Sequence, residues 1–403
     1  MGVEKLEKEI KNINQALKHS ISWLESSGIQ NSQNNKNFLS GSVNAWYDPV
    51  KKKYSFVYSE INGYFMTMMV FLYKRTGKKK YLEKGLKAAK WLISRAQEKN
   101  GGFRCLFLID KNSSHAHKKN QIYSFDNGII INGLVSLYKE TKKPFLIKSA
   151  EKCANWIINF CIDNNNLVKP VYEIEQNKFF ESDKEWSTTS GSYHIKISIG
   201  LANLYSVIKK KIYIDAAKKI CNSSLKFQKK DGRFVSFSFK GGTNAHPHCY
   251  SAEGFWVLGT YLNNKKYLSS SEKATKWIIS KQNPAGKIPR LFLINSSIYH
   301  ERIDAVAQTI RLIFLIKFNK NKKNLIVSKP KLKKLLKIML KYQNLKTNNP
   351  KIKGSFSWGK KSNGTILKHA NSWVTFFTIQ SLFFYKDFLE NNKENKFDEF
   401  TFV

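Results

Sequence analysis

The apolar positions of the chain recur with a helical period, and the predicted helices alternate between two types. One type is apolar nearly all round, which is typical of a helix buried on several sides. It is predicted over 59–77, 126–141, 192–208, 250–262, 301–318 and 371–389. The other type is apolar on one face and rich in lysine on the other, and it follows each of the first five at 81–103, 144–162, 213–228, 266–282 and 330–343.

One amphipathic helix is predicted before the first apolar one, at 4–26, and Gly28 ends it. The last apolar helix, 371–389, has no amphipathic helix after it. We therefore expect the N-terminal helix, about 4–27, to pack as the outer helix of the last pair. The prediction is an all-α chain of six helical hairpins in a single domain, 1–403, with a tail at 391–403.

Short turns join each apolar helix to its amphipathic partner, and long loops lead on to the next apolar helix. We expect short β-hairpins in these long loops. The long loops all emerge at the end where the apolar helices begin. Because binding residues concentrate on loops held by a rigid scaffold, this end is the predicted functional site.

The amphipathic helices end in a repeated tail in which glutamine is followed by glycine and then by an aromatic residue. Examples run from Gln97 to Phe103 and from Gln228 to Phe234. From about residue 58 to 390, this pattern resembles the (α/α)6 toroid enzymes, namely the N-acylglucosamine 2-epimerase-like, unsaturated glucuronyl hydrolase-like and uronate C5-epimerase-like proteins. The tails also resemble those of terpenoid cyclases and prenyltransferase β subunits. The resemblance implies a toroid and indicates architecture more than reaction, because many chemistries share this fold.

The formal net charge of +40 changes this picture little. Of the 69 basic residues, 62 are lysines, and they are spread over predicted helix faces instead of forming one stripe. We interpret them as solvated outer faces and expect no specific nucleic-acid partner, although the charge alone leaves nucleic-acid binding as an alternative. Such a field also attracts acidic substrates.

The cysteines and the hydropathy bear on the compartment. Five cysteines with no repeated spacing do not suggest a disulfide framework and fit a reducing compartment. The N-terminal stretch lacks the apolar core of a signal peptide. The sequence also has no run of about 18 apolar residues, which is the length that a membrane-spanning helix needs. We expect a cytoplasmic protein with no membrane span.

Polar side chains gather where the apolar helices are predicted to begin, and they are densest between residues 193 and 256. Carboxyl, imidazole and phenol groups are the ones that transfer protons in catalysis. At these positions a carboxylate can instead cap a helix, and a lone histidine can simply be packed. The candidates for catalysis are Tyr58, Glu60, Asp126, His194, His246, His248 and Glu253.

A second set of residues has the chemistry to bind a sugar or its carboxylate. Arg302 is one of only seven arginines, and in a chain dominated by lysine it suggests bidentate binding of a carboxylate. The alternative is an internal ion pair with Asp304. Tryptophan at the mouth would stack on a sugar face or close a hydrophobic core. The substrate-binding candidates are Arg302, Asp304, Trp358, Asn371 and Trp373.

Histidine and cysteine at 246, 248 and 249 are ligand types for zinc, but no second pair completes a set, so we expect no metal and no cofactor. We predict a carbohydrate-active protein of the epimerase, hydrolase or lyase type, acting on a sugar or uronate-containing oligosaccharide in surface-polysaccharide metabolism. Six helix N-termini at one mouth favour an anionic substrate. Arg302 would bind its carboxylate, a histidine or Glu60 would be the base, and Asp126 or Tyr58 the acid. A terpenoid-cyclase-like or prenyltransferase-like toroid and a non-catalytic glycan-binding toroid stay open as alternatives, as does the oligomeric state.

Overall fold

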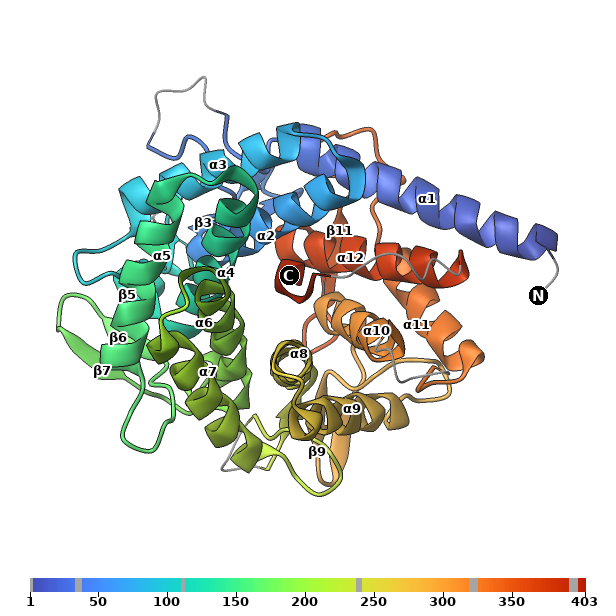
Figure 1. Ribbon diagram of the computed structural model, residues 1–403. Helices are drawn as coiled ribbons and strands as arrows, with labels where there is room; N and C mark the ends of the chain where they lie inside the picture. The colour runs from blue at the N-terminus through green and yellow to red at the C-terminus, as the bar shows by residue number, and fades with distance from the viewer. Residues whose placement is uncertain (1–2, 33–37, 110–112, 237–240, 319–324, 391–397) are drawn as a thin grey trace.

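The computed structural model describes residues 3–32, 38–109, 113–236, 241–318, 325–390 and 398–403. Within these ranges, twelve α-helices form an inner and an outer ring (Figure 1). The inner helices are α2 (Ser59–Thr76), α4 (Ser124–Thr141), α6 (Ile195–Ile208), α8 (Ala245–Tyr261), α10 (Ile303–Phe318) and α12 (Ser372–Leu389). The outer helices are α1 (Val3–Ser26), α3 (Lys80–Trp91), α5 (Pro144–Trp156), α7 (Lys211–Ser224), α9 (Lys265–Ser280) and α11 (Lys329–Lys341).

The inner helices contact one another in chain order, and α12 contacts α2, so the inner ring closes. Each of the outer helices from α3 to α11 packs on the inner helix that precedes it in the chain, and α1 packs on α12. The result is an (α/α)6 toroid. The fold class predicted from the sequence is confirmed.

The two types of helix take the places that their apolar patterns require. Every residue of α2 from Ser59 to Leu72 is buried, because this inner helix is covered on all sides. The outer helix α3 buries only one stripe, which includes Tyr81 and Trp91. Neighbouring inner helices also approach closely: a Cβ atom on Gly128 of α4 would lie 2.5 Å from the Cα atom of Ile197 in α6.

Where they occur, the glutamine tails tie one hairpin to the next. The Nε2 atom of Gln97 donates to the carbonyl oxygens of Gly101 in its own tail and Ser149 in α5, both at 3.1 Å. The backbone N–H of Phe103 donates to Oδ1 of Asn127 in α4 at 2.7 Å. The tail therefore satisfies loop backbone groups while it fixes the spacing of adjacent hairpins. The tails of Gln228 and Gln282 make corresponding glutamine contacts with Gly232 and Ser270 and with Gly286 and Lys331.

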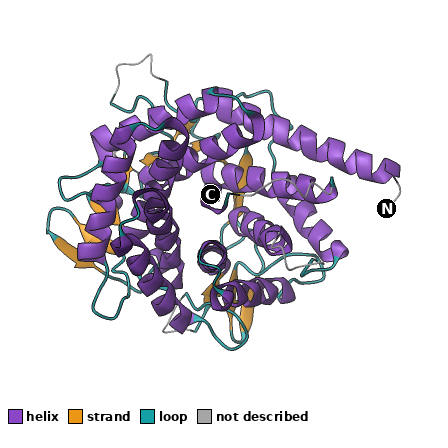
Figure 2. Cartoon of the chain, viewed as in Figure 1, coloured by secondary structure: helices purple, strands orange, loops and turns teal. Residues whose placement is uncertain are grey.

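Short strands fill the loops that lead from an outer helix to the next inner helix (Figure 2). They pair antiparallel in four small sheets, in the orders β11-β12-β1-β2, β10-β9-β8, β3-β4 and β5-β6-β7. The predicted β-hairpins of the long loops are confirmed. The strands are β1 (Trp46–Asp48), β2 (Lys53–Tyr54), β3 (Val57–Tyr58), β4 (Leu106–Phe107), β5 (Gln121–Tyr123), β6 (Val171–Glu173), β7 (Lys178–Phe180), β8 (Thr243–Asn244), β9 (Leu291–Leu293), β10 (Ser296–Ile298), β11 (Phe356–Lys360) and β12 (Ile366–Asn371).

The last six residues lie inside the ring, where Figure 1 places the C-terminus. The expected tail 391–403 falls partly outside the described residues, which resume at 398. The short helix η8 (Glu399–Thr401) contacts α2, α4, α6 and α8, and Phe400, Phe402 and Val403 are buried. Residues 398–403 therefore pack into the centre of the toroid instead of extending from it. None of the helices over the described ranges combines the length and apolar character that crossing a bilayer would need.

Candidate active site

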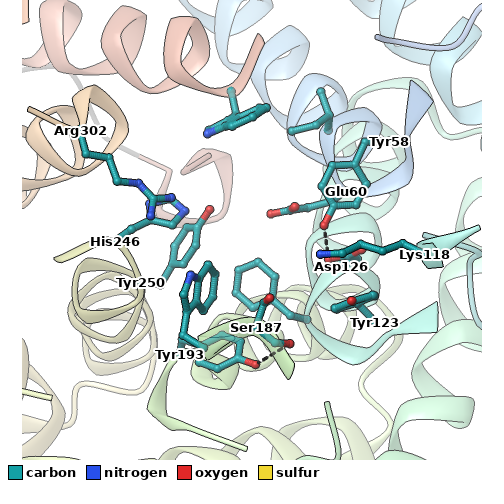
Figure 3. A pocket seen from close by; sticks show the side chains of 14 residues that line it. Tyr58, Glu60, Lys118, Tyr123, Asp126, Ser187, Tyr193, His246, Tyr250 and Arg302 are labelled. Carbon is teal, nitrogen blue, oxygen red and sulfur yellow. Dashed lines mark hydrogen bonds between the residues drawn. The ribbon is translucent and has the colours of Figure 1, made fainter. Parts of the chain in front are cut away.

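A pocket of about 180 Å³ lies where the inner helices begin. Parallel inner helices present their N-termini at the same end of the ring, so residues distant in sequence meet there. Figure 3 shows side chains from α2, α4, α8 and the start of α10 directed into this space. Of the residues predicted from the sequence, it is lined by Tyr58, Glu60, Asp126, His246, Arg302 and Trp373.

Two buried carboxyl groups form one wall of the pocket. Asp126, the third residue of α4, accepts a hydrogen bond from the Tyr58 hydroxyl at 3.4 Å, and its Oδ2 atom has no partner among the described residues. Burial raises the pKa of Asp126 well above its usual value, and the charge of nearby Glu60 raises it further. Burial also raises the pKa of Glu60 to about 7, against the opposing effect of the Tyr58 and Tyr64 hydroxyls. Glu60 therefore titrates near neutral pH, and the raised pKa of Asp126 favours its protonated form.

Helix capping does not explain these two carboxyls. The N-cap residues of α2 and α4 are Tyr58 and Tyr123, and neither makes a side-chain capping bond. Glu60 and Asp126 lie inside the first turn, where the helix dipole favours a negative charge, yet burial prevails and raises both pKa values. Paired acids with raised pKa values are typical of proton-transfer sites.

His246 lies on the opposite wall (Figure 3). Its Nδ1 atom is 2.7 Å from Oε1 of Gln308, whose Nε2 atom donates to Glu253 at 3.3 Å. The Glu253 carboxylate thereby orients the Gln308 amide with its oxygen toward the imidazole. We assign the His246 proton to Nδ1 on this basis, which leaves Nε2 as an acceptor. Burial, and then the charge of Arg302, lowers the pKa of His246 to about 3, so the imidazole is neutral.

Asp304 lies behind this wall of the pocket and holds the side chains of Arg302, Trp373 and His246 in place. It accepts hydrogen bonds from Nε and Nη2 of Arg302 at 2.8 and 3.0 Å and from the Trp373 indole at 3.2 Å. Its Oδ2 atom is also 3.5 Å from Nδ1 of His246. Burial would raise the pKa of Asp304, but the charge of Arg302 holds it below its usual range. Asp304 does not line the pocket, whereas Arg302 both pairs with it and lines the pocket.

His248 does not reach the pocket, although it is only two residues from His246. Its Nδ1 atom accepts the backbone N–H of Phe234 at 3.1 Å, and its Nε2 atom donates to the carbonyl of Ala274 at 3.0 Å. His248 thus accepts the backbone N–H of the tail aromatic Phe234, as Asn127 in α4 accepts that of Phe103. With both ring nitrogens engaged, His248 fits neither the predicted proton transfer nor a metal. The described residues hold no group of three His, Cys, Asp or Glu side chains placed to bind one metal ion.

His194, Asn371 and Trp358 also lie outside the pocket lining. The Nδ1 atom of His194 is 3.2 Å from the carbonyl oxygen of Gly191, and burial lowers the pKa of this histidine to about 3. Asn371 caps α12 by accepting the Val374 N–H at 3.1 Å. Trp358 packs against Arg302 at the mouth of the pocket, and the guanidinium carbon lies 5.1 Å from the centre of the indole ring.

Glu253 lies deeper in the ring and is fully buried. Its two oxygens are 3.2 Å from Nζ of Lys196 and 2.7 Å from Nη2 of Arg311. Arg311 also donates to Gln380 and to the carbonyl of Val403. We call Lys196, Glu253, Arg311 and Gln380 the deep cluster. Glu253 does not line the pocket and is linked to His246 through Gln308, so the predicted direct role in catalysis has no geometric support.

Several lining residues escaped the sequence analysis. Tyr250 lies one turn after His246 on α8, a spacing that the sequence does contain. Lys118 and Trp186 come from long loops, and Trp186 contacts the His246 ring edge-on at 5.7 Å. Nothing in the sequence separates Lys118 from the other lysines. The remaining missed side chains are Ile61, Tyr123, Phe125, Ser187 and Tyr193.

Comparisons with known proteins agree with this architecture. The cellobiose 2-epimerase of Bacillus thermoamylovorans has a TM-score of 0.74 at 11% identity, over 96% of this chain and 100% of that one. An unsaturated glucuronyl hydrolase specific for heparin has 0.69 at 12% identity (94% and 98% covered). A D-mannose isomerase has 0.68 at 10% identity (94% and 97% covered). The chain shares the (α/α)6 toroid of these enzymes.

Comparison of sequences identifies no family for this chain. No family model matches the chain. A Caenorhabditis elegans protein described as uncharacterized is 31% identical over 123 residues, which are 30% of this chain and only 16% of that protein. The toroid's fold therefore rests on structural likeness, and the residues of the pocket carry the argument for activity.

Proposed function

We propose that this toroid is a carbohydrate epimerase that inverts the carbon next to the carboxylate of a uronate unit in an oligosaccharide. The observation that carries the proposal is the arrangement of proton-transfer groups on opposite walls of one pocket. Glu60 and Asp126 stand on one side, and His246 stands on the other beside Arg302 (Figure 3). Inversion of a carbon centre needs a proton to leave one face and return to the other.

Each side chain has a role that follows from its surroundings. Arg302 binds the uronate carboxylate and stabilises the negative charge that develops when the neighbouring proton leaves. Glu60, with its pKa raised to about 7 by burial, is matched to proton abstraction near neutral pH. His246 serves the opposite face: its free Nε2 accepts the proton of one epimer while protonated Glu60 delivers a proton to the other face, and in the reverse reaction ionised Glu60 accepts a proton and the imidazolium of His246 delivers one. A carboxylate bound to Arg302 offsets the charge that helps to lower the His246 pKa, so substrate binding makes this imidazole a better base.

The remaining lining supports a sugar over an isoprenoid. Trp186, Trp373 and Tyr250 offer flat faces for a pyranose ring, and they alternate with polar groups around the pocket. A terpenoid site would be lined by apolar side chains alone. The structural relatives named cellobiose 2-epimerase and glucuronyl hydrolase support the same choice. All five cysteines are buried free thiols, which supports a cytoplasmic role in surface-polysaccharide metabolism.

A second candidate is hydrolysis or elimination. Burial and the charge of Glu60 raise the pKa of Asp126 well above its usual value, so the pair alone could supply an acid and a base from one wall of the pocket. In that case His246 would not exchange a proton with the sugar. The two candidates therefore differ in what His246 does.

Proton exchange in heavy water separates them. We would incubate the protein with a panel of uronate oligosaccharides in D2O and follow the products by NMR. Epimerisation predicts deuterium at the carbon next to the carboxylate and the appearance of the inverted sugar. Arg302→Ala and His246→Ala should abolish both, and Arg95→Ala, outside the pocket lining, should not. Cleavage of the oligosaccharide without deuterium at that carbon would reject epimerisation in favour of the second candidate.

A further inference from the structure

The arginines of this chain are nearly all accounted for by partners. Five of the seven form ion pairs with carboxylates: Arg75, Arg104, Arg233, Arg302 and Arg311. Arg95 stacks on the ring of Phe38. Arg290 likewise has no carboxylate partner among the described residues, but it contacts a backbone carbonyl and an indole ring that also contacts the pocket residue Arg302.

Arg290 is held rigidly at the mouth of the pocket. Its backbone N–H donates to Ile298 of β10 at 2.7 Å, and its carbonyl accepts the N–H of Ala245, the first residue of α8, at 3.0 Å. Its Nη1 atom donates to the carbonyl of Lys360 at the end of β11. The guanidinium lies 4.6 Å from the ring centre of Trp358. A long side chain fixed at both ends needs little further ordering when it binds a ligand.

The same indole joins Arg290 to the pocket. Arg302 lies 5.1 Å from the ring centre of Trp358, so two guanidinium groups contact one tryptophan. The strand β11 can approach this closely because residue 359 is a glycine with φ of +109°, whose backbone pairs with Arg302 in an isolated β-bridge. A Cβ atom at Gly359 would collide with the carbonyl of Glu301.

The charge at this rim is not balanced. Asp304 is the ion-pair partner of Arg302, and Glu301 pairs with Lys287 at 2.9 Å and Lys360 at 3.3 Å. Burial, and then the charge of Arg302, lowers the pKa of Arg290 to about 10, against the opposing effect of the Asp304 charge. A half-buried guanidinium beside an aromatic face is a site for a carboxylate carried on a ring.

We propose that Arg290 and Trp358 form an outer subsite that binds the carboxylate of a second uronate unit, next to the unit held in the pocket by Arg302. This inference rests on the proposed function and sharpens it: the preferred substrate has acidic sugars at two successive positions. Trp358 and the Lys360 carbonyl hold the guanidinium of Arg290 in place, and Arg290 pairs with the carboxylate of the second unit. The structure thus assigns specificity for an acidic oligomer over a single uronate or a neutral disaccharide.

Calorimetric titration with galacturonate, digalacturonate and the two monomethyl esters of digalacturonate tests the subsite, because each ester keeps one carboxylate for Arg302. The native protein should bind digalacturonate roughly tenfold more tightly than galacturonate, as expected for one charge-assisted pair, and both monoesters should lose that advantage. Arg290→Gln should bind both acids equally while its affinity for galacturonate stays unchanged. Arg290→Lys, which keeps the charge but not the planar fork, should fall between. Arg95→Gln is the matched control and should behave as the native protein.

The outcomes separate this inference from the function on which it rests. Equal affinity of the native protein for galacturonate and digalacturonate, or a preference that survives in Arg290→Gln, overturns the outer subsite and leaves the pocket proposal standing. Failure of the native protein to bind either acid rejects the uronate-binding pocket itself. The ester comparison uses the unaltered protein, so its result does not depend on how well the variants fold.

Discussion

Two groups of buried charges lie on the axis of the toroid, and they differ in how completely their polar atoms are satisfied. In the deep cluster, both oxygens of Glu253 are bonded to cations or amides, and Arg311 reaches Glu253, Gln380 and a backbone carbonyl, so that each charge has a counter-charge although Nε of Arg311 has no partner among the described residues. In the pocket above, Asp126 leaves one oxygen without a partner among the described residues, and no cation neutralises Glu60 by direct contact.

The difference indicates what each group is for. Buried charges that neutralise one another stabilise the fold. Removal of one partner leaves the other charge buried without a counter-charge, which lowers the free energy of unfolding. Buried carboxyls that are left incompletely paired keep raised pKa values and can exchange protons. We therefore assign stability to the deep cluster and chemistry to Glu60 and Asp126. The following four predictions test that division, from the largest expected effect to the smallest.

Asp126→Asn should abolish proton transfer while the fold survives. The amide has the same shape but can neither hold nor relay a proton beside Glu60, so turnover of a uronate substrate should fall by about 10²–10⁴-fold. The free energy of unfolding should stay unchanged or rise, because a buried ionisable group is removed. Activity assays and urea denaturation of the same preparation measure both quantities. Substantial residual turnover would remove Asp126 from the mechanism.

Glu253→Gln should do the reverse and act chiefly on stability. It leaves the ammonium of Lys196 and the guanidinium of Arg311 buried without a counter-charge, at a cost of about 3–5 kcal/mol in the free energy of unfolding. Glu390→Gln, which weakens a surface pair with Lys386, should cost less than about 1 kcal/mol. Urea denaturation compares the two variants. A loss in Glu253→Gln no larger than in the control would contradict the structural role of the deep cluster.

The pH dependence of stability should reveal Glu60. Its pKa is raised from 4.5 to about 7 on folding, so between these values the folded chain holds a proton that the unfolded chain has released. Stability therefore falls as pH rises from about 4.5 to 7, by about 1–3 kcal/mol from this group. Glu60→Gln should flatten this part of the curve, measured by urea denaturation at a series of pH values. An unchanged slope would show that Glu60 titrates normally.

His248→Asn should have the smallest effect. Asparagine already makes the corresponding bond at position 127, so the Phe234 N–H keeps an acceptor and the free energy of unfolding should change by only about 1 kcal/mol. The same change at His246 should leave stability alone and reduce turnover. Thermal melts and activity assays on the pair measure the contrast. Equal losses of activity in both variants would show that the two histidines are not divided between structure and chemistry.

The two histidines also show what could not be predicted from the sequence, namely which of them faces the pocket. The sequence predicted a loop before residue 250, whereas α8 begins at Ala245, capped by Asn244, with Pro247 in its first turn. A helix turns by roughly 100° per residue, so side chains two apart point in nearly opposite directions, whereas those four or seven apart share a face. Once these residues are placed in a helix, His246, Tyr250 and Glu253 follow one stripe, and His248 faces the next hairpin.

The alternation of apolar and amphipathic helices was sufficient to predict the six hairpins and the end of the ring where the pocket lies. These features depend on periodicity and on short turns, which are local properties of the chain. It also placed Tyr58, Glu60, Asp126, His246, Arg302 and Trp373 near one mouth, because each begins an inner helix.

Only the tertiary structure decided which charges are satisfied. Asp304 and Arg302 are neighbours in sequence, but Glu253 meets Lys196 and Arg311 only because three inner helices converge. Lys118 and Trp186 reach the pocket from loops whose paths follow from packing. Burial and the distance between charges set the pKa values of Glu60 and Asp126, and both quantities exist only when the ring has closed.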